Sequence, residues 1–274
     1  MADIKLDYFI FNDNIYPSSE FENLYIEDAK SLYEVIRVCS STPLFLEEHL
    51  NRLFKSANIV GYSLTLTLEE IRSNIKKIIN KNNATDYNLK IVINNLDNPS
   101  PNVYYFFITT NYPDPSLYTK GVDAFLYSAE RDNPNAKVIN ATLREKVNAL
   151  MQEKNCFEAI LVNNNGYITE GSRSNLFFIK DNTLYTTKGS DVLLGITRDR
   201  IISLAIKDGI NVVEDDIHVD SLPSFSSIFI SGTSPKALPI KNLDNMTFSP
   251  KEELMQRIIK LYDNEIDSYI KSHN

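Results

Sequence analysis

Asn111-Tyr112-Pro113-Asp114-Pro115 divides this chain into two parts. Neither a helix nor a central strand accepts two prolines so closely spaced, because proline lacks the backbone N–H donor and restricts the residue before it. We therefore predict a domain boundary near residues 112–120, with one domain over residues 1–115 and a second over residues 116–274. Helical and strand periodicities occur on both sides of the boundary, so the sequence predicts a two-domain α/β or α+β protein.

The first part alternates strand and helix patterns. Apolar residues recur at helical spacing between Leu46 and Val60, and Gly61 follows as a helix stop. Thr67 and Glu70 form a capping-box pattern that predicts the start of a second helix. Strands are predicted over residues 4–11, 33–39, 88–94 and 103–109.

The second part continues with strands, helices and a long final helix. Ser249-Pro250-Lys251-Glu252 combines an N-cap, a proline at the first helical position and an acidic third residue, so we expect the final helix to start there. Helices are also predicted over residues 141–154 and 197–207. Strands are predicted over residues 122–129, 157–163, 167–169, 175–180 and 183–187.

Charge and composition exclude several classes of protein. The 274 residues carry a net charge of −8, which argues against a nucleic acid or an anionic membrane as the main partner. Apolar runs such as Val103–Ile108 are too short to cross a bilayer, and the N-terminus has no apolar signal segment. We therefore expect a cytoplasmic protein without a membrane anchor.

The cysteines and histidines exclude further kinds of site, and the small number of glycines bears on backbone geometry. Two cysteines, Cys39 and Cys156, cannot form a disulfide framework or a four-ligand zinc site, and the three histidines have no ligand-like spacing. We expect no metal site. Only eight glycines are present, so each glycine is expected to serve a backbone geometry that needs it.

Three polar loops in the second part are candidates for chemistry. Leu194-Gly195-Ile196-Thr197-Arg198 precedes a helix, where free N–H groups favour an anion, although Thr197 could simply cap that helix. Ser231-Gly232-Thr233-Ser234 is either a second anion-binding turn or an ordinary loop after a strand. Glu170 stands among hydroxyl-bearing residues and could equally be a solvated acid.

The order of several short motifs is more specific than any one of them. The series consists of Tyr33-Glu34-Val35-Ile36-Arg37-Val38, Glu47–Leu53 with Ser56-Ala57, Ala136-Lys137-Val138-Ile139-Asn140, Glu158–Leu161, Gly166–Ser172, Asn175-Leu176-Phe177, Gly195–Arg198 and Phe229–Ser234. This series resembles the fold-type IV pyridoxal-phosphate enzymes, the class IV aminotransferase family. That family includes branched-chain and D-amino-acid aminotransferases and aminodeoxychorismate lyase.

The resemblance implies a fold and an activity. It implies a small N-terminal α/β domain and a larger C-terminal pseudo-barrel domain, with pyridoxal 5'-phosphate between them and a homodimer that completes the substrate pocket. It implies a ping-pong aminotransferase that uses an amino acid and a 2-oxo acid. Such an enzyme needs an amine that bonds to the cofactor, a carboxylate that binds the pyridine nitrogen and hydrogen-bond donors that bind the phosphate.

The resemblance also assigns roles to individual residues. Lys137 matches the lysine that bonds to the cofactor and moves the substrate proton, Glu170 the acid at the pyridine nitrogen, and Tyr33 an active-site tyrosine. The small domain is expected to supply Tyr33 and Arg52, and the larger domain Lys137 and Glu170. The remaining cofactor-binding matches are Arg52, Leu193, Ile196, Thr197, Thr233 and Ser234. Read without the resemblance, the same residues could be a surface lysine, a half-buried structural tyrosine, a solvated helix arginine and a core leucine.

Departures from the family pattern bear on the substrate. Most members carry Gly-Asp-Gly where this chain has Ala29-Lys30-Ser31, and the D-specific members carry an Arg-x-His pair that is missing from residues 89–95. The lyases usually show Lys-His-x-Asn-Arg, whereas this chain has Lys137-Val138-Ile139-Asn140-Ala141. We therefore expect an aminotransferase for an L-amino acid with an apolar side chain, such as a branched-chain one. The alternatives are a lyase that releases pyruvate and a binding protein that keeps the fold without the chemistry.

Overall fold

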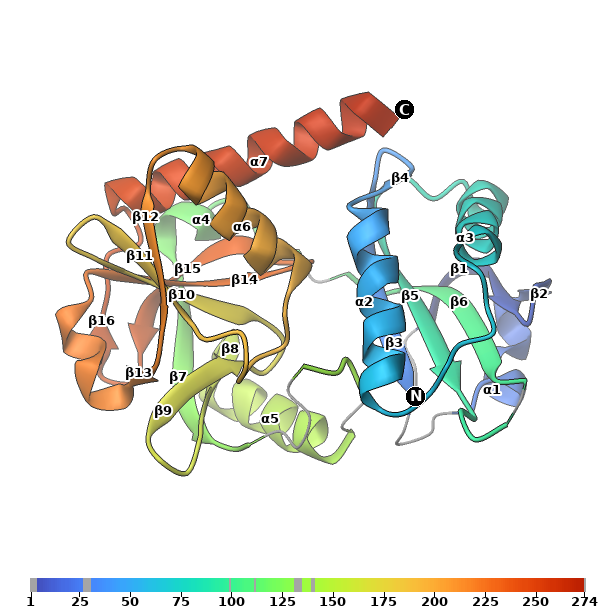
Figure 1. Cartoon of the computed structure of the whole chain (residues 1–274), viewed down its shortest axis with the longest axis horizontal. Helices are drawn as coiled ribbons and strands as arrows, with labels where there is room; N and C mark the ends of the chain where they lie inside the picture. The colour runs from blue at the N-terminus through green and yellow to red at the C-terminus, as the bar shows by residue number, and fades with distance from the viewer. Residues whose placement is uncertain are drawn as a thin grey trace. The chain divides into compact units, whose positions relative to one another are not determined.

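The chain folds into two compact units in a computed structural model (Figure 1). The structure describes residues 4–26, 31–98, 100–110, 112–130, 135–138 and 141–273, without the side chains of Ala141 and Thr142. Ala29 and Lys30 of the altered loop therefore lie outside the described residues. Unit 1 comprises Met1–Asn111, Ala136–Asn140 and Asp267–Asn274, and unit 2 comprises Tyr112–Asn135 and Ala141–Ile266.

Unit 1 is built on an antiparallel sheet with the strand order β2-β1-β6-β5-β3-β4. The four strands predicted in this part are confirmed as β1, β3, β5 and β6, whereas β2 and β4 were not predicted. The strands are β1 (Ile4–Phe11), β2 (Asn14–Pro17), β3 (Leu32–Cys39), β4 (Thr42–Pro43), β5 (Tyr87–Asn94) and β6 (Asn102–Ile108).

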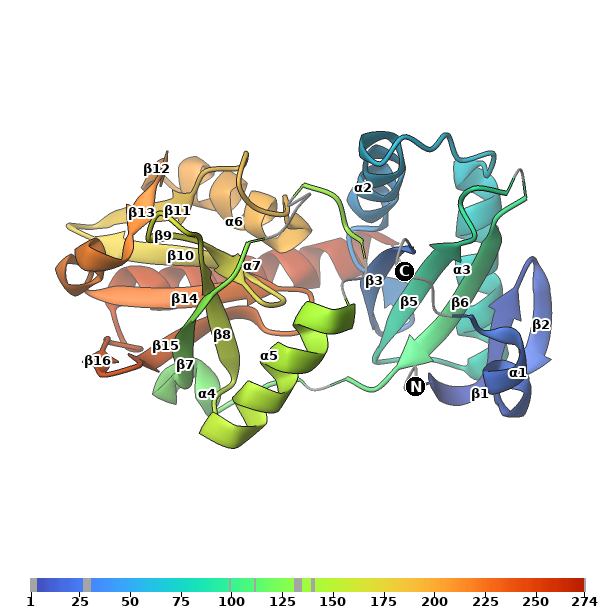
Figure 2. The same cartoon turned by 90° about the horizontal axis from the view of Figure 1, so that it is seen from below.

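The two faces of this sheet bury different side chains because successive residues of a strand point in opposite directions. Helices α2 (Leu46–Ile59) and α3 (Leu68–Asn82) cover one face, where an aliphatic core includes Leu32, Ile36 and Leu50 (Figures 1 and 2). The opposite face is aromatic and also packs the short helix α1 (Phe21–Leu24). Its buried residues are Phe9, Phe21, Val92, Tyr104 and Phe106, with Tyr33 partly buried beside them.

The predicted capping box at the start of α3 is present. Thr67 Oγ1 accepts a hydrogen bond from the Glu70 backbone N–H at 3.2 Å, and the Glu70 carboxylate accepts one from the Thr67 N–H at 2.7 Å. Both hydrogen bonds satisfy N–H groups that a helix start otherwise leaves without partners.

Unit 2 contains a mixed sheet in the order β12-β11-β10-β14-β15-β7-β8-β9-β13, with β16 paired to β15. The sheet curls, so that β9 lies beside β10 and β11 as well as pairing with β8. The strands are β7 (Val122–Ser128), β8 (Glu158–Val162), β9 (Tyr167–Gly171), β10 (Asn175–Lys180), β11 (Thr183–Thr187), β12 (Asn211–Asp215), β13 (Ile217–His218), β14 (Ser227–Gly232), β15 (Lys236–Leu243) and β16 (Met246–Thr247).

The helices of unit 2 pack against the curled sheet (Figure 2). They are α4 (Leu117–Lys120), α5 (Ala141–Lys154), α6 (Ile196–Lys207) and α7 (Glu253–His273), whose last residues belong to unit 1. Residues Val147 and Met151 of α5 pack on Phe125 and Ala159 of the sheet. The predicted α5 and α6 are confirmed within one residue at their starts.

The expected start of the final helix is wrong by three residues. Helix α7 begins at Glu253 and not at Pro250, because Glu252 supplies the cap: its Oε2 accepts a hydrogen bond from the Met255 N–H at 3.0 Å. Ser249 instead accepts a hydrogen bond through its carbonyl from the Ser227 hydroxyl. Leu254 and Ile258 of this helix are buried.

Both units mix helices with strands, so the predicted two-domain α/β class is confirmed. The domain boundary between residues 115 and 116 stays a prediction. By their contacts, residues 136–138 and the last turns of α7 are grouped with the N-terminal part of the chain.

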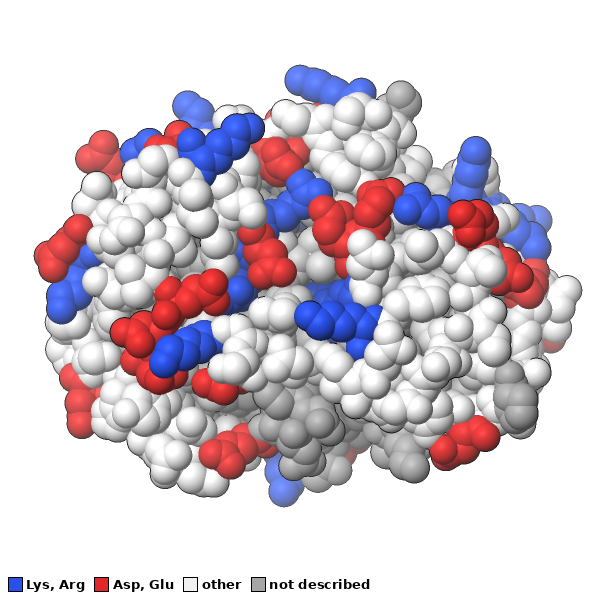
Figure 3. Space-filling view, in the orientation of Figure 1, with Lys and Arg blue, Asp and Glu red and all other residues white. Residues whose placement is uncertain are grey.

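The surface carries acidic and basic side chains interspersed over the visible face of each unit (Figure 3). Across the described helices, none combines the length and the apolar character needed to span a bilayer. Among the described side chains, no three His, Cys, Asp or Glu residues come close enough to hold a metal ion together.

Two glycines of unit 2 allow a matched test of the fold. Gly121 and Gly209 have φ of 74° and 77°, so alanine at either position strains the backbone by about 1–2 kcal/mol, and the ψ of 170° at Gly121 adds to that strain because this region is essentially confined to glycine. A Cβ at Gly121 would also lie 2.9 Å from the backbone N of Lys241, whereas one at Gly209 would meet nothing within 4 Å. We expect Gly121→Ala to lower the free energy of unfolding by about 1–3 kcal/mol more than Gly209→Ala, in urea denaturation. Equal losses would contradict this close approach of the two backbones.

Candidate active site

Lys137 belongs to unit 1, although it follows the predicted domain boundary near residues 112–120. Its carbonyl accepts a hydrogen bond from the Tyr33 N–H at 3.2 Å, and the next residue, Val138, forms an antiparallel bridge with Leu32. The Lys137 N–H donates to Ser56 Oγ of α2 at 3.3 Å. These backbone bonds add the lysine segment to the edge of β3. The expectation that the C-terminal domain supplies Lys137 stays a prediction, although by its contacts Lys137 is grouped with unit 1.

The side chain of Tyr33 lies next to that of Lys137. The Lys137 Nζ lies 4.6 Å from the centroid of the Tyr33 ring, on the aromatic face of the sheet. An ammonium group at this distance is attracted by the negative face of the ring. The structure thus brings together two of the predicted catalytic residues.

Arg52 forms a buried ion pair with Glu34. Its Nε and Nη2 donate to the two carboxylate oxygens of Glu34, each at 2.7 Å, and the Glu34 side chain is fully buried. The Arg52 side chain is only 10% exposed, so the alternative of a solvated helix arginine is wrong. The bidentate pairing fixes the plane of the guanidinium group.

His49 completes this cluster, and the charges set its protonation. Its Nδ1 lies 2.8 Å from Glu34 Oε2. Burial raises the pKa of Glu34, but Arg52 and His49 outweigh it and lower that pKa to about 2. Burial lowers the pKa of His49 despite the opposing effect of Glu34, and the charges of Arg52 and Lys137 lower it further. The imidazole is therefore neutral at neutral pH and donates its Nδ1–H to the carboxylate.

In unit 2, Glu170 and Leu193 lie in direct contact. Glu170 lies near the end of β9 with only 3% of its surface exposed, and its Oε2 accepts a hydrogen bond from the Leu193 N–H at 3.1 Å. The alternative of a solvated acid is therefore wrong. Leu193 is 9% exposed, and its backbone is held by this carboxylate.

Asn175 holds the same loop from the neighbouring strand β10. Its Nδ2 donates to the Leu193 carbonyl at 2.8 Å. A Cβ on Gly195 would lie 2.1 Å from Asn175 Oδ1, so only glycine allows this approach. Gly171 is constrained in the same way, because its Cβ would lie 2.1 Å from Ser174 Oγ. Two of the scarce glycines therefore shape the candidate site.

Helix α6 begins immediately after this loop. Gly195 is its N-cap, no described side chain caps it, and Ile196 and Thr197 are its first two residues. Thr197 lies inside the helix, so the alternative that it only caps the helix is wrong. Uncapped N–H groups and the positive end of the helix dipole together favour an anion.

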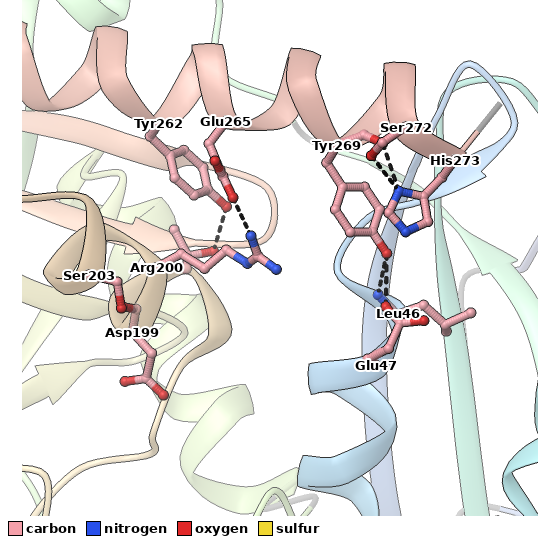
Figure 4. A network of polar contacts seen from close by, with 11 residues as sticks. Leu46, Glu47, Asp199, Arg200, Ser203, Tyr262, Glu265, Tyr269, Ser272 and His273 are labelled. Atoms are coloured by element: carbon pink, nitrogen blue, oxygen red, sulfur yellow. Dashed lines mark hydrogen bonds and ion pairs between the residues drawn. The ribbon is translucent and has the colours of Figure 1, made fainter. Parts of the chain in front are cut away.

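Tyr262 of α7 supports Thr197. Its hydroxyl donates to Thr197 Oγ1 at 3.2 Å, and both residues are buried. Tyr262 and Glu265 point from α7 toward α6, where Glu265 pairs with Arg200 (Figure 4). In the part of α7 that belongs to unit 1, Tyr269 points to the start of α2 and donates to Glu47 Oε2 at 3.0 Å.

Thr233 and Ser234 form the turn between β14 and β15. This turn follows Ser231, which lies opposite Asn175 in the β10–β14 ladder. The Ser231 Oγ is buried and has no hydrogen-bond partner among the described residues. A buried hydroxyl of this kind is rare unless a ligand or water satisfies it.

The predicted residues thus form two groups, one in each unit. Tyr33, Arg52 and Lys137 gather around β3 of unit 1. Glu170, Leu193, Ile196 and Thr197 lie along one loop and helix start of unit 2, with the turn of Thr233 and Ser234 on the next strands.

Comparison with known proteins identifies the family. Residues 31–243 match the family model described as "Amino-transferase class IV". The chain therefore belongs to the class IV aminotransferase family, and the resemblance drawn from the motifs is confirmed. It is 28% identical over 255 residues to a D-alanine aminotransferase of Bacillus licheniformis, covering 87% of this chain and 89% of that protein. It is 30% identical over 279 residues to the branched-chain-amino-acid aminotransferase of Escherichia coli, covering 90% and 88%.

Solved structures share the fold. A crystal structure of the Escherichia coli branched-chain amino acid aminotransferase superposes with a TM-score of 0.85 at 27% identity, over 96% of this chain and 95% of that one. A branched-chain aminotransferase from Thermoproteus uzoniensis has a TM-score of 0.84 at 22% identity, over 98% and 97%. The predicted fold is confirmed.

The sequence alone did not indicate four supporting residues. Glu34 and His49 hold Arg52, Asn175 holds the Leu193 loop, and Tyr262 holds Thr197. A partial signal existed for Glu34, His49 and Asn175, because all three stand inside quoted motifs. Nothing in the local sequence marks Tyr262, which is 65 residues from its partner.

The buried ion pair of Arg52 predicts a specific stability profile. Glu34→Gln leaves a buried guanidinium without its counter-charge, so we expect the free energy of unfolding to fall by about 3–5 kcal/mol at neutral pH. Because the pKa of Glu34 is lowered from 4.5 to about 2, its ionised form stabilises the fold above pH 4.5, and this stabilisation is lost as the pH falls toward 2. The difference in the free energy of unfolding between the wild type and Glu34→Gln, measured by urea denaturation, should therefore become smaller as the pH falls from 4.5 toward 2.

Glu69→Gln provides the control for this experiment. Glu69 is exposed in the first turn of α3, so its substitution should change the free energy of unfolding by only a few tenths of a kcal/mol, about the value for surface positions. A Glu34→Gln loss no larger than the control, or one independent of pH, would contradict the buried ion pair.

Proposed function

We propose that this protein uses pyridoxal 5'-phosphate to move an amino group from an amino acid to a 2-oxo acid by a ping-pong mechanism. Membership of the class IV aminotransferase family, together with Lys137 at the matching position, is the observation that carries the proposal. When bound, the cofactor supplies a carbonyl carbon that takes up the amino group and a ring that withdraws electrons. The amino acid and the 2-oxo acid are the small-molecule partners of the reaction.

The residues of unit 2 fit a phosphorylated pyridine. Helix α6 offers uncapped N–H groups, and Ser231 Oγ is buried without a partner among the described residues. Each of these features is suited to a bound anion or polar ligand. The fit therefore supports the cofactor on grounds that are independent of the family match.

Roles in holding the cofactor follow from chemistry and position. The N–H groups of Ile196 and Thr197 and the Thr197 hydroxyl would bind the phosphate, with the turn of Thr233 and Ser234 and the guanidinium of Arg52. Leu193 would pack on the ring, and the buried Glu170 carboxylate would keep the ring nitrogen protonated. A buried carboxylate is a strong partner for a cation because little water competes for it.

Lys137 and Tyr33 would act on the substrate. The Lys137 amine would bond to the cofactor and then, released by the incoming amino group, would take the proton from the substrate α-carbon. This step needs a neutral amine, because only the amine without its added proton can accept the proton of the α-carbon. Tyr33, whose ring lies beside Nζ, would line the position of the substrate.

The amino donor is proposed from the relatives and from the missing Arg-x-His pair. We propose an L-amino acid with an apolar side chain, such as a branched-chain one, since several relatives are named as branched-chain-amino-acid aminotransferases. A homodimer and a cytoplasmic location, which the sequence led us to expect, remain part of this proposal.

Replacing Lys137 tests the proposal directly. Borohydride reduction of the wild-type holoenzyme should add the cofactor mass to the peptide that contains Lys137, because the reagent fixes a reducible bond between carbon and Nζ. Lys137→Ala should bind the cofactor without this modification and should lose transfer between valine and 2-oxoglutarate. An unmodified Lys137 in a wild-type enzyme that has bound the cofactor would rule out the mechanism.

The same assay distinguishes transamination from the lyase reaction. Glutamate formed at the expense of valine supports transamination. Release of pyruvate from an aminodeoxychorismate-like substrate, with no 2-oxo acid present, would support the lyase. The Lys146→Ala variant is the matched control, because Lys146 is exposed on α5 and should leave both readouts unchanged.

Tyr262→Phe tests how Thr197 is oriented. Loss of the hydrogen bond to Thr197 should raise the dissociation constant of pyridoxal phosphate about 2- to 10-fold, the equivalent of one neutral hydrogen bond. The constant is measured by titrating the apoenzyme and following absorbance. In a Thr197→Val background the same substitution should have no further effect, because the acceptor is gone. An additive effect in the double variant would show that Tyr262 acts elsewhere.

A further inference from the structure

Glu158, the first residue of β8, is a buried carboxylate that the proposed mechanism does not use. Only 4% of its surface is exposed. Its Oε1 accepts hydrogen bonds from the N–H groups of Ala159 and Ser172, at 3.0 and 3.1 Å, and from the Ser172 hydroxyl at 2.5 Å. Its Oε2 accepts one from the Ser174 hydroxyl at 2.8 Å. Both oxygens act only as acceptors in these bonds, as those of an ionised carboxylate do.

The turn between β9 and β10 supplies three of these four donors. The Gly171 N–H donates to the Ser174 carbonyl at 2.7 Å and closes the turn. A Cβ on Gly171 would lie 3.2 Å from Glu158 Cδ and 2.1 Å from Ser174 Oγ, so the turn approaches the carboxylate too closely for a side chain at this position. Because a buried charge is costly unless hydrogen bonds satisfy it, the carboxylate holds the turn against itself.

This turn joins the two residues that hold the Leu193 loop. Glu170 directly precedes Gly171 and accepts a hydrogen bond from the Leu193 N–H at 3.1 Å. Asn175 directly follows Ser174 and donates to the Leu193 carbonyl at 2.8 Å. A displacement of the turn would therefore move the Glu170 carboxylate relative to this loop. Such a displacement matters because a hydrogen bond weakens steeply as its angle departs from linear.

We propose that Glu158 is a positioning residue for Glu170. By fixing the turn, Glu158 places the Glu170 carboxylate where it binds the ring nitrogen of pyridoxal phosphate. The inference rests on the proposed function, in which Glu170 has that partner. Glu158 acts through the reach of its side chain and not through its charge, because all four of its donors are neutral groups.

Two substitutions separate the reach of Glu158 from its charge. Glu158→Gln keeps the length, so its amide oxygen can accept from the donors on Oε1 while the Ser174 hydroxyl rotates to accept from the amide nitrogen. Glu158→Asp keeps the charge but is too short to reach the same donors. In titrations of the apoenzyme, Glu158→Asp should raise the dissociation constant of pyridoxal phosphate about 10- to 100-fold, the effect of misplacing one charge-assisted hydrogen bond, and Glu158→Gln less than about 3-fold.

The order of the two variants decides between the explanations. A larger loss of affinity in Glu158→Gln than in Glu158→Asp, or no loss in either, would overturn the proposal. Ser174→Ala removes one donor from the carboxylate and serves as a milder variant if Glu158→Asp does not fold. It should weaken cofactor binding about 2- to 10-fold, the effect of one lost hydrogen bond.

An analogue of the cofactor with a C–H group in place of the ring nitrogen tests whether Glu158 acts through Glu170. The analogue offers the Glu170 carboxylate no ring nitrogen, so Glu158→Asp should change its dissociation constant less than about 3-fold. Equal weakening of both compounds would show a merely structural role for Glu158 and would overturn the proposal. Glu153→Asp is the matched control, because Glu153 is exposed on α5 and should leave both constants unchanged.

Amide hydrogen exchange of the apoenzyme keeps this test separate from the proposed function. Because the Leu193 N–H donates to Glu170, misplacing that carboxylate in Glu158→Asp should speed exchange at Leu193 about 10-fold or more, with no change at the capped N–H of Glu70. Unchanged exchange at Leu193 would overturn the role of Glu158. Wild-type protein that binds no pyridoxal phosphate would overturn the proposed function, and exchange at Leu193 would still decide whether Glu158 positions Glu170.

Discussion

A carboxylate without any exposed surface governs the arrangement of unit 1. Glu34 is tolerated inside the fold because Arg52 and His49 satisfy it, and the three residues come from β3 and α2. This pairing sets the angle of the guanidinium group and ties the helix to the strand. Since Lys137 is held by the backbone of the neighbouring residue Tyr33, one strand positions both the proposed anion-binding arginine and the proposed catalytic amine.

Much of the secondary structure could be predicted because its signals are local. The capping box of Thr67 and Glu70 is complete within four residues, and the strands of unit 1 have continuous apolar patterns. The start of α7 could not be placed in this way. Ser249 is the preferred cap by residue type, but in the structure the Glu252 carboxylate accepts the hydrogen bond from the Met255 N–H.

Residues of the candidate site could be predicted where they stand within short contiguous motifs of the family pattern. Lys137, Glu170 and Thr197 were predicted in this way, and the structure describes their surroundings. The packing of residues 136–138 within unit 1 could not be predicted from the sequence, because it depends on a bridge between Leu32 and Val138. Supporting residues such as Tyr262 were missed for the same reason, since pairing over long separations leaves no local pattern.

Because β3 is pleated, the adjacent residues Tyr33 and Glu34 point to opposite faces of the sheet and have different contacts. Glu34 points to the helices and fixes Arg52, while Tyr33 points to the aromatic face where Lys137 lies. Substitutions on one face therefore leave the other nearly undisturbed. Over evolutionary time, such a strand can acquire a new substrate preference through its odd-numbered positions while the even-numbered ones keep the older machinery intact. An insertion or deletion within β3 would exchange the two faces at once, so this strand can diversify by substitution but not in length.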